Sequence, residues 1–138
     1  MSKQPMRATG TLNILLVEDS AVLAGHVSEL IGRLPDVQLK GIAETERDAI
    51  RMEGEIHPQV LILDLHLREG NGFGVLRGIE RIRPRPQVVV LTTFGLEEYR
   101  VQARNLGVAA FLDKSDDYHL LPGLLLDMAR DSSDGACG

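Results

Sequence analysis

Three acidic residues in this sequence follow or interrupt apolar runs of the kind that form buried strands. Glu18 and Asp19 come directly after LNILLV (12–17), and Asp64 lies inside VLILDLHL (60–67). A buried carboxylate without a partner is costly, so Asp64 must be paired or must lie where a strand emerges. Three carboxylates brought together repel one another, which raises their pKa values, and a divalent cation relieves this repulsion. The pattern therefore predicts a site for Mg²⁺, which suits a few carboxylates, water and phosphoryl oxygens.

Further polar residues end two later apolar runs. Thr92 ends QVVVLT (87–92) with Thr93 next to it, and Lys114 follows VAAFLD (108–113). Carboxylates attack phosphorus to give acyl phosphates, and a hydroxyl and an ammonium can bind the oxygens of the new phosphoryl group. Each of these residues alone is more often a cap, a turn residue or a solvated charge. The prediction of a site therefore depends on all of them lying at one edge of a sheet.

The elements that would position these residues alternate along the chain. Predicted strands cover 12–17, 37–43, a segment from 60, 87–92 and 108–113. Predicted helices cover 20–34, 45–56, a segment from about 73 to 83, 95–107, and a last segment from about 117 that ends before 131. Such alternation is typical of a parallel sheet with helices on both faces.

The apolar content of the runs indicates the order of the strands. The runs at 12–17 and 60–63 are apolar almost throughout, as central strands are, whereas 37–43 alternates and suits an edge. We therefore expect a flavodoxin-like three-layer α/β sandwich with strand order 2-1-3-4-5 and five helices. In this order, ligands bind beyond the carboxyl ends of the strands, where all the polar residues named above are expected.

Composition limits the class of protein. The chain has 138 residues, of which 43% are hydrophobic, enough for one domain with a sizeable core. Its net charge of −5 argues against direct binding of nucleic acid or an anionic membrane. No apolar run approaches the roughly 18 residues of a membrane span, and Cys137, the single cysteine, excludes an internal disulfide. We expect a cytoplasmic protein with a flexible lead over 1–11, a domain over 12–130 and a flexible tail over 131–138.

The ordered set of motifs resembles a known family. LLVEDS, LILDL followed by GNGFGVL, VVVLTT and FLDKS are similar to the receiver domain of bacterial two-component response regulators, including the single-domain chemotaxis regulator. The resemblance extends over about residues 12–130. It implies that Asp64 is a phosphoacceptor for a partner histidine kinase or phosphotransfer protein. It also implies that Mg²⁺ is held by Glu18, Asp19, Asp64 and the backbone carbonyl of His66.

The same resemblance assigns roles to residues on the last two strands. Lys114 would contact the phosphoryl group, and Thr92 would move toward it and form a hydrogen bond. Phe111 matches the aromatic residue that turns inward on activation, and here it lacks the hydroxyl that the family often has. The helix at 95–107, the strand at 108–113 and the last helix would form the output face. Ser115 follows Lys114 where the family often has proline.

Other functions remain open from the sequence. We expect a non-enzymatic switch that assists its own phosphorylation and dephosphorylation and acts through an output protein or a homodimer. The alternative is the receiver half of a DNA-binding transcriptional regulator, and a third option is a phosphorelay intermediate. A phosphatase of the haloacid dehalogenase type is disfavoured because it requires an aspartate where His66 stands. Four arginines at 77, 81, 83 and 85 are most simply explained as a solvated helix end and loop.

Overall fold

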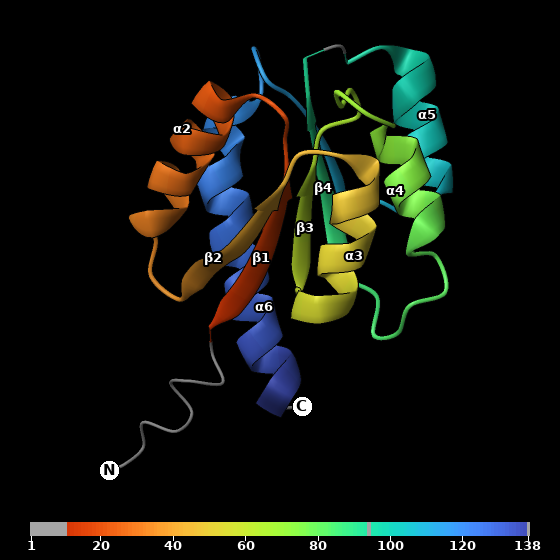
Figure 1. Ribbon diagram of the computed structural model, residues 1–138. Helices are drawn as coiled ribbons and strands as arrows, with labels where there is room; N and C mark the ends of the chain where they lie inside the picture. Colours follow the sequence, from red (N-terminus) through yellow and green to blue (C-terminus); the bar gives the residue numbers. More distant parts are fainter. Residues whose placement is uncertain (1–10, 94, 138) are drawn as a thin grey trace.

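Five parallel strands form one sheet in the order β2-β1-β3-β4-β5 (Figure 1). The computed structural model describes residues 11–93 and 95–137, the last five by backbone alone. The strands are β1 (Leu12–Val17), β2 (Val37–Ala43), β3 (Val60–Leu63), β4 (Gln87–Thr92) and β5 (Ala110–Asp113). The predicted fold class and strand order are therefore confirmed. β2 lies at an edge and its side chains alternate between partly buried and exposed, as its sequence pattern predicts.

Five α-helices and one 3₁₀ turn connect and follow the strands. They are α2 (Ala21–Gly32), α3 (Glu46–Ile56), α4 (Gly72–Gly78), α5 (Glu97–Asn105), η1 (Tyr118–Leu120) and α6 (Leu121–Cys137). Ser20, Thr45 and Asn71 are N-caps whose side-chain oxygens accept backbone N–H groups of α2, α3 and α4. Each of these helices therefore begins close to the carboxyl end of the preceding strand.

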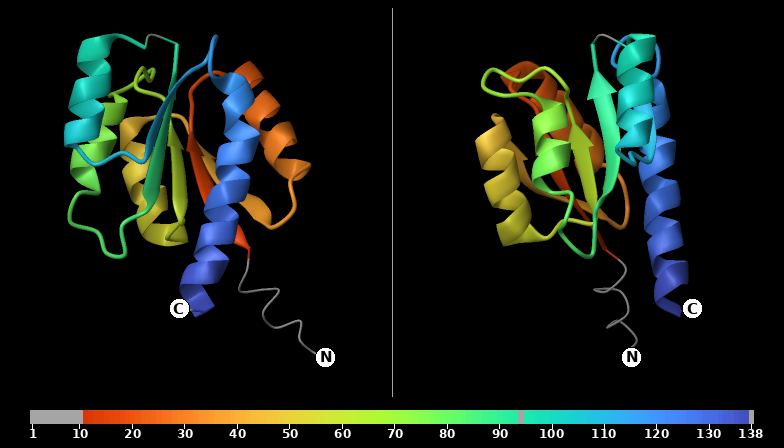
Figure 2. Two further views of the ribbon diagram at one scale, coloured as in Figure 1. Left: turned by 180° about the vertical axis from the view of Figure 1, so that it is seen from behind. Right: turned by 90° about the vertical axis from the view of Figure 1, so that its right-hand side faces the viewer.

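The sheet separates two apolar layers. On one face, β1 residues Ile14 and Leu16 pack with α2 and α6, which lie over the sheet in the left view of Figure 2. On the other face, Leu15 and Val17 pack with α3, α4 and α5. Because successive strand residues point to opposite faces, a central strand covered on both sides must be apolar throughout. β3 meets this requirement, since all four of its residues are buried.

Several predicted boundaries are wrong. α4 ends at Gly78 rather than near Arg83, because it contains three glycines, which are poor helix formers, and two prolines follow at 84 and 86. The last helix begins at Leu121 after the 3₁₀ turn, and it continues to Cys137 instead of ending before Asp131. No proline interrupts this extension, and the Ser132 hydroxyl accepts a hydrogen bond from Gln59 Nε2 at 3.2 Å.

The sequence also predicts a flexible N-terminal lead over 1–11 and no membrane span. Of the predicted flexible lead, residues 1–10 lie outside the described residues. Among the residues that are described, no helix is long and apolar enough to cross a membrane.

Candidate functional site

Three carboxylates meet where β1 and β3 end, at the upper edge of the sheet in Figure 1. Glu18 and Asp19 follow β1, and Asp64 follows β3. One oxygen of each carboxylate lies within 4.8 Å of the others. The backbone continues the parallel pairing here, because Asp64 N donates to Val17 O at 3.0 Å. Asp64 is only 5% exposed, so the aspartate inside the apolar run is nearly buried and needs a partner.

Lys114 supplies that partner. Its ammonium nitrogen lies 3.0 Å from Asp64 Oδ2 and 3.0 Å from Glu18 Oε1. The backbone holds the lysine at this edge, since Lys114 N donates to Thr92 O at 2.9 Å and thereby extends the pairing of β4 and β5. The cation therefore bridges carboxylates that follow two different strands, and Asp64 is paired although it is buried.

Burial and pairing shift the pKa values of two groups in the cluster. Burial raises the pKa of Glu18, and the nearby charge of Asp64 raises it further, while the Ser20 N–H and the Lys114 ammonium act in the opposite direction. The sequence predicts that repulsion among the carboxylates raises their pKa values, but burial contributes more than repulsion to the raised pKa of Glu18. Burial lowers the pKa of Lys114, but hydrogen bonds and charge interactions with Glu18 and Asp64 outweigh this effect and raise it above the ordinary value.

The donor atoms fit a small divalent cation. All three groups are carboxylates, the hard oxygen ligands that Mg²⁺ prefers. Opposite ligands of an octahedral Mg²⁺ are about 4.2 Å apart, given metal–oxygen distances near 2.1 Å. The carboxylate oxygens already lie within 4.8 Å of one another, so only small side-chain movements are needed for binding. The loop after β3 contributes to the geometry, since His66 N donates to Asp64 Oδ1 at 3.1 Å.

Thr92 and Phe111 lie on adjacent strands, as the sequence predicts. In the register of β4 and β5, Thr92 pairs with Asp113 and Val90 pairs with Phe111. Because side chains two residues apart share a face, Thr92 and Phe111 point to the same side of the sheet. Thr92 is fully buried, and its hydroxyl oxygen has no hydrogen-bond partner among the described residues. A buried hydroxyl without a partner is uncommon and requires a functional or structural reason.

Arg100 of α5 covers the ring of Phe111. The guanidinium carbon lies 4.7 Å from the ring centroid, within the range of a cation–π contact. Its Nη1 donates to Phe111 O at 3.5 Å, and its Nη2 lies 3.8 Å from Asp117 Oδ2. Sequence analysis missed Arg100, because only the packing of α5 against β5 brings the arginine over the ring.

A second residue that the sequence analysis missed is Glu46, which fixes the loop after β3. Its carboxylate accepts from Asn71 N at 3.1 Å, and its own N–H donates to Glu69 O at 3.0 Å. A side chain at Gly70 or Gly74 would collide with the Glu46 side chain, and Gly70 also has a positive φ of 83°. A carboxylate from α3 therefore holds the loop in place. The helix predicted over 45–56 begins correctly at this point, but its sequence gives no sign of this contact.

The comparison with protein-family models decides the classification. The model described as the response regulator receiver domain matches residues 14–123. This chain belongs to that family. A receiver domain is a module of a two-component system, and the five motifs quoted above fall inside the matched region.

Individual relatives of this receiver domain agree with the classification. A protein-glutamate methylesterase/protein-glutamine glutaminase of Methylobacillus flagellatus is 32% identical over 106 residues, which cover 75% of this chain and 30% of that protein. The receiver domain thus spans less than a third of this curated relative. The solved response regulator domain of Thermotoga maritima CheB has a TM-score of 0.77 at 22% identity, covering 90% of this chain and 97% of that one.

A DNA-binding response regulator of the LuxR family from Staphylococcus aureus is also similar in structure. Its TM-score is 0.78 at 24% identity, with 86% of this chain and 98% of that chain covered. At such identities the two solved structures show that the receiver domain shares their fold, and no more.

Proposed function

We propose that this receiver domain is a phosphoacceptor switch, phosphorylated on Asp64 by a partner histidine kinase or phosphotransfer protein in a Mg²⁺-dependent reaction. One observation carries the proposal. A nearly buried aspartate lies at the edge of the sheet, bridged to Glu18 by the Lys114 ammonium, with a third carboxylate from Asp19 beside it. This arrangement supplies a nucleophile, a cation for phosphoryl oxygens and ligands for a metal within one small site.

The proposed reaction moves a phosphoryl group from a histidine to the aspartate. One Asp64 carboxylate oxygen attacks phosphorus while the P–N bond of the phosphohistidine breaks and its electron pair returns to the imidazole. Mg²⁺, held by Glu18, Asp19, Asp64 and the backbone carbonyl of His66, would offset the negative charge on the phosphoryl oxygens. Lys114 then remains within reach of an oxygen on the product, because its ammonium already contacts Asp64 Oδ2.

The switch would pass from Asp64 to the output face through β4 and β5. A phosphoryl oxygen would give the Thr92 hydroxyl an acceptor, which no described residue provides. Movement of Thr92 vacates space that the Phe111 ring can fill, since close-packed interiors do not tolerate voids. The ring then leaves Arg100, and the face formed by α5, β5 and α6 changes shape. This face would control an output protein or form a homodimer, without direct contact to nucleic acid or a membrane.

Mass spectrometry can test the phosphoacceptor. The chain is incubated with Mg²⁺ and acetyl phosphate, and borohydride trapping should place the label on Asp64. Asp64→Asn should abolish labelling, and chelation of the metal should reduce it strongly. Asp116→Asn, which removes an exposed carboxylate of the β5–α6 connection, is the matched control and should be labelled normally. Undiminished labelling of Asp64→Asn, or labelling that needs no metal, would contradict the proposal.

The alternative of a receiver half of a DNA-binding regulator is not favoured. The curated relative described above is named as a methylesterase and glutaminase, and the likeness to a DNA-binding regulator is structural at 24% identity. The methylesterase activity in the relative's name belongs to a protein of which this chain spans 30%, so it is not carried over. We propose instead a non-enzymatic switch that acts in the cytoplasm.

A further inference from the structure

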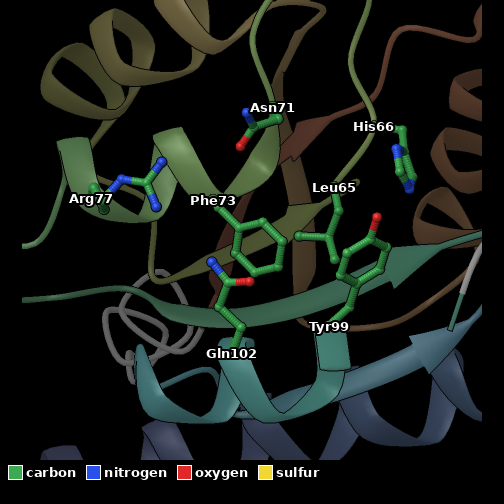
Figure 3. Close-up of a pocket in the computed structure, with 7 residues that line it drawn as sticks. All are labelled: Leu65, His66, Asn71, Phe73, Arg77, Tyr99 and Gln102. Atoms are coloured by element: carbon green, nitrogen blue, oxygen red, sulfur yellow. The ribbon is translucent and has the colours of Figure 1, made fainter. Parts of the chain in front are cut away.

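A cavity lies beside the phosphoacceptor site, between α4, α5 and the loop after β3 (Figure 3). It measures about 400 Å³, within the range of known ligand pockets. None of the three clustered carboxylates and neither Lys114 nor Thr92 lines it. The cavity adjoins the phosphoacceptor cluster and shares His66 with the proposed metal ligands, but the proposed phosphorylation gives its other lining residues no role.

Aromatic rings and one leucine form the apolar part of this cavity. Phe73 of α4 and Tyr99 of α5 meet edge to face, with centroids 5.9 Å apart. His66 makes a similar contact with Tyr99 at 5.8 Å. Leu65, 2% exposed, lies between them in Figure 3. Such a set of rings favours another ring or a large apolar side chain in an offset or edge-on arrangement.

The polar part of the cavity favours an anion. Arg77 and Gln102 lie on opposite helices and extend toward the cavity in Figure 3, and no carboxylate lines it. Within the part of the chain that the structure describes, the Arg77 side chain has no ion pair or hydrogen bond. A guanidinium that is not already paired can bind a carboxylate through two parallel hydrogen bonds, which lysine cannot do.

We propose that this cavity is a docking site for an acidic segment of a partner protein that presents an aromatic side chain beside a carboxylate. The ring would pack on Phe73 and Tyr99, and the carboxylate would pair with Arg77. Charge complementarity favours this occupant, since Arg77 is the one fixed charge among the lining residues and no described residue supplies its counter-charge. Aromatic residues and arginine are enriched among the residues that contribute most to binding at protein interfaces.

A peptide titration tests the site. The probe is the blocked peptide acetyl-EEFEE-amide, added to the ¹⁵N-labelled chain and followed by amide chemical shifts. We expect shifts centred on Phe73, Arg77, Tyr99 and Gln102, with a dissociation constant of about 1 mM or below. The peptides acetyl-KKFKK-amide and acetyl-EESEE-amide keep the ring or the charge alone, and each should bind at least about tenfold more weakly.

Two variants with matched controls assign the effect to the cavity. Arg77→Gln and Gln102→Glu both change exposed positions, so the fold should survive, and each should weaken EEFEE binding at least about fivefold. Arg81→Gln removes a similar exposed charge from the turn that follows α4, and Asn105→Glu adds a carboxylate at the last residue of α5. Neither control residue lines the cavity, and both variants should bind as the native chain does.

Several results would overturn the docking site. The proposal is wrong if the native chain binds the EEFEE and KKFKK peptides equally well, or if Arg77→Gln and Arg81→Gln bind EEFEE equally well. It is also wrong if millimolar EEFEE causes no amide chemical shift changes. Binding of N-acetyl-phenylalanine as tight as that of the peptide would indicate a small-molecule site instead. Dimerisation without peptide that Arg77→Gln abolishes would make a second copy the occupant. Asp64→Asn should bind EEFEE normally, so this test and the phosphorylation test can fail independently.

Discussion

Lys114 neutralises two carboxylates that the fold has largely withdrawn from water. Its loss would leave Glu18, 3% exposed, without a cation, and breaking a pair of this kind costs about 3 kcal/mol. Lys114→Ala should therefore unfold at lower urea concentration than the native chain in the absence of metal. Added Mg²⁺ should stabilise the variant more than the native chain, because the metal takes over the role of the missing ammonium.

Urea unfolding with and without MgCl₂ measures both effects of the Lys114→Ala change. Lys40→Ala removes an exposed lysine of β2 and serves as the control, with little expected change in either condition. If Mg²⁺ stabilises Lys114→Ala no more than the native chain, the lysine and the metal do not share the carboxylates.

Glu53 of α3 is a buried carboxylate outside the site. It is 1% exposed, its Oε1 has no partner among the described residues, and burial raises its pKa above the ordinary value. A raised pKa in the folded state means that the carboxyl costs least at low pH and destabilises the fold as the pH rises through this pKa. Glu53→Leu should therefore raise the free energy of unfolding by about 1 kcal/mol at pH 7, with a smaller gain below pH 4.5.

Chemical denaturation of Glu53→Leu across this pH range checks the sign. Glu53→Gln keeps the shape and removes the charge, so it should show the same pH trend, whereas Glu55→Leu changes an exposed residue of the same helix and should show no gain at high pH. A stability difference for Glu53→Leu that is constant with pH would show that ionisation of the carboxyl is not the cause.

The two neighbouring strands β4 and β5 are proposed to act together as one switch. Thr92→Val removes the hydroxyl, which has no partner among the described residues, and keeps the volume of the side chain. Phe111→Ala removes the ring that would fill the vacated space. With Mg²⁺ and beryllofluoride as a phosphoryl mimic, each variant should lose most of the amide shifts that the native chain shows in α5. The double variant should be little worse than either single one, because both residues serve the same step. Fully additive losses would show two independent effects.

The alternation of apolar runs was sufficient to predict every strand and the strand order. Because the carboxyl ends of parallel strands share an edge, the same pattern also predicted correctly that Glu18, Asp64 and Lys114 lie close together. Helix ends were predicted less well, since Gly78 ends α4 early and the polar segment after Arg130 stays helical. Arg100 and Glu46 could not be found, because their contacts join elements far apart in the sequence.

Binding of Mg²⁺ and a phosphoryl mimic at the proposed site should raise the stability of the whole domain. A ligand that binds only the folded chain stabilises it by about 2.7 kcal/mol at one hundred times its dissociation constant. Mg²⁺ with beryllofluoride should therefore raise the melting temperature by about 10 °C in a domain of this size. Asp64→Asn should lose this rise, and Asp116→Asn should retain it. A rise of equal size in Asp64→Asn would place the binding elsewhere on the molecule.

The contact of Glu46 with the loop after β3 limits which substitutions can accumulate as related sequences evolve. Any side chain at position 70 or 74 would occupy the space of the Glu46 carboxylate, and the loop would lose the acceptor for Asn71 N. A shorter residue at 46 would in turn remove the collision at position 74, whereas the positive φ at position 70 would still require glycine there. In sequences that diverge from this one, positions 46 and 74 should therefore be replaced together or not at all, although they lie more than twenty residues apart. A lineage that has acquired a proline in this loop should be the one in which the glutamate is free to vary.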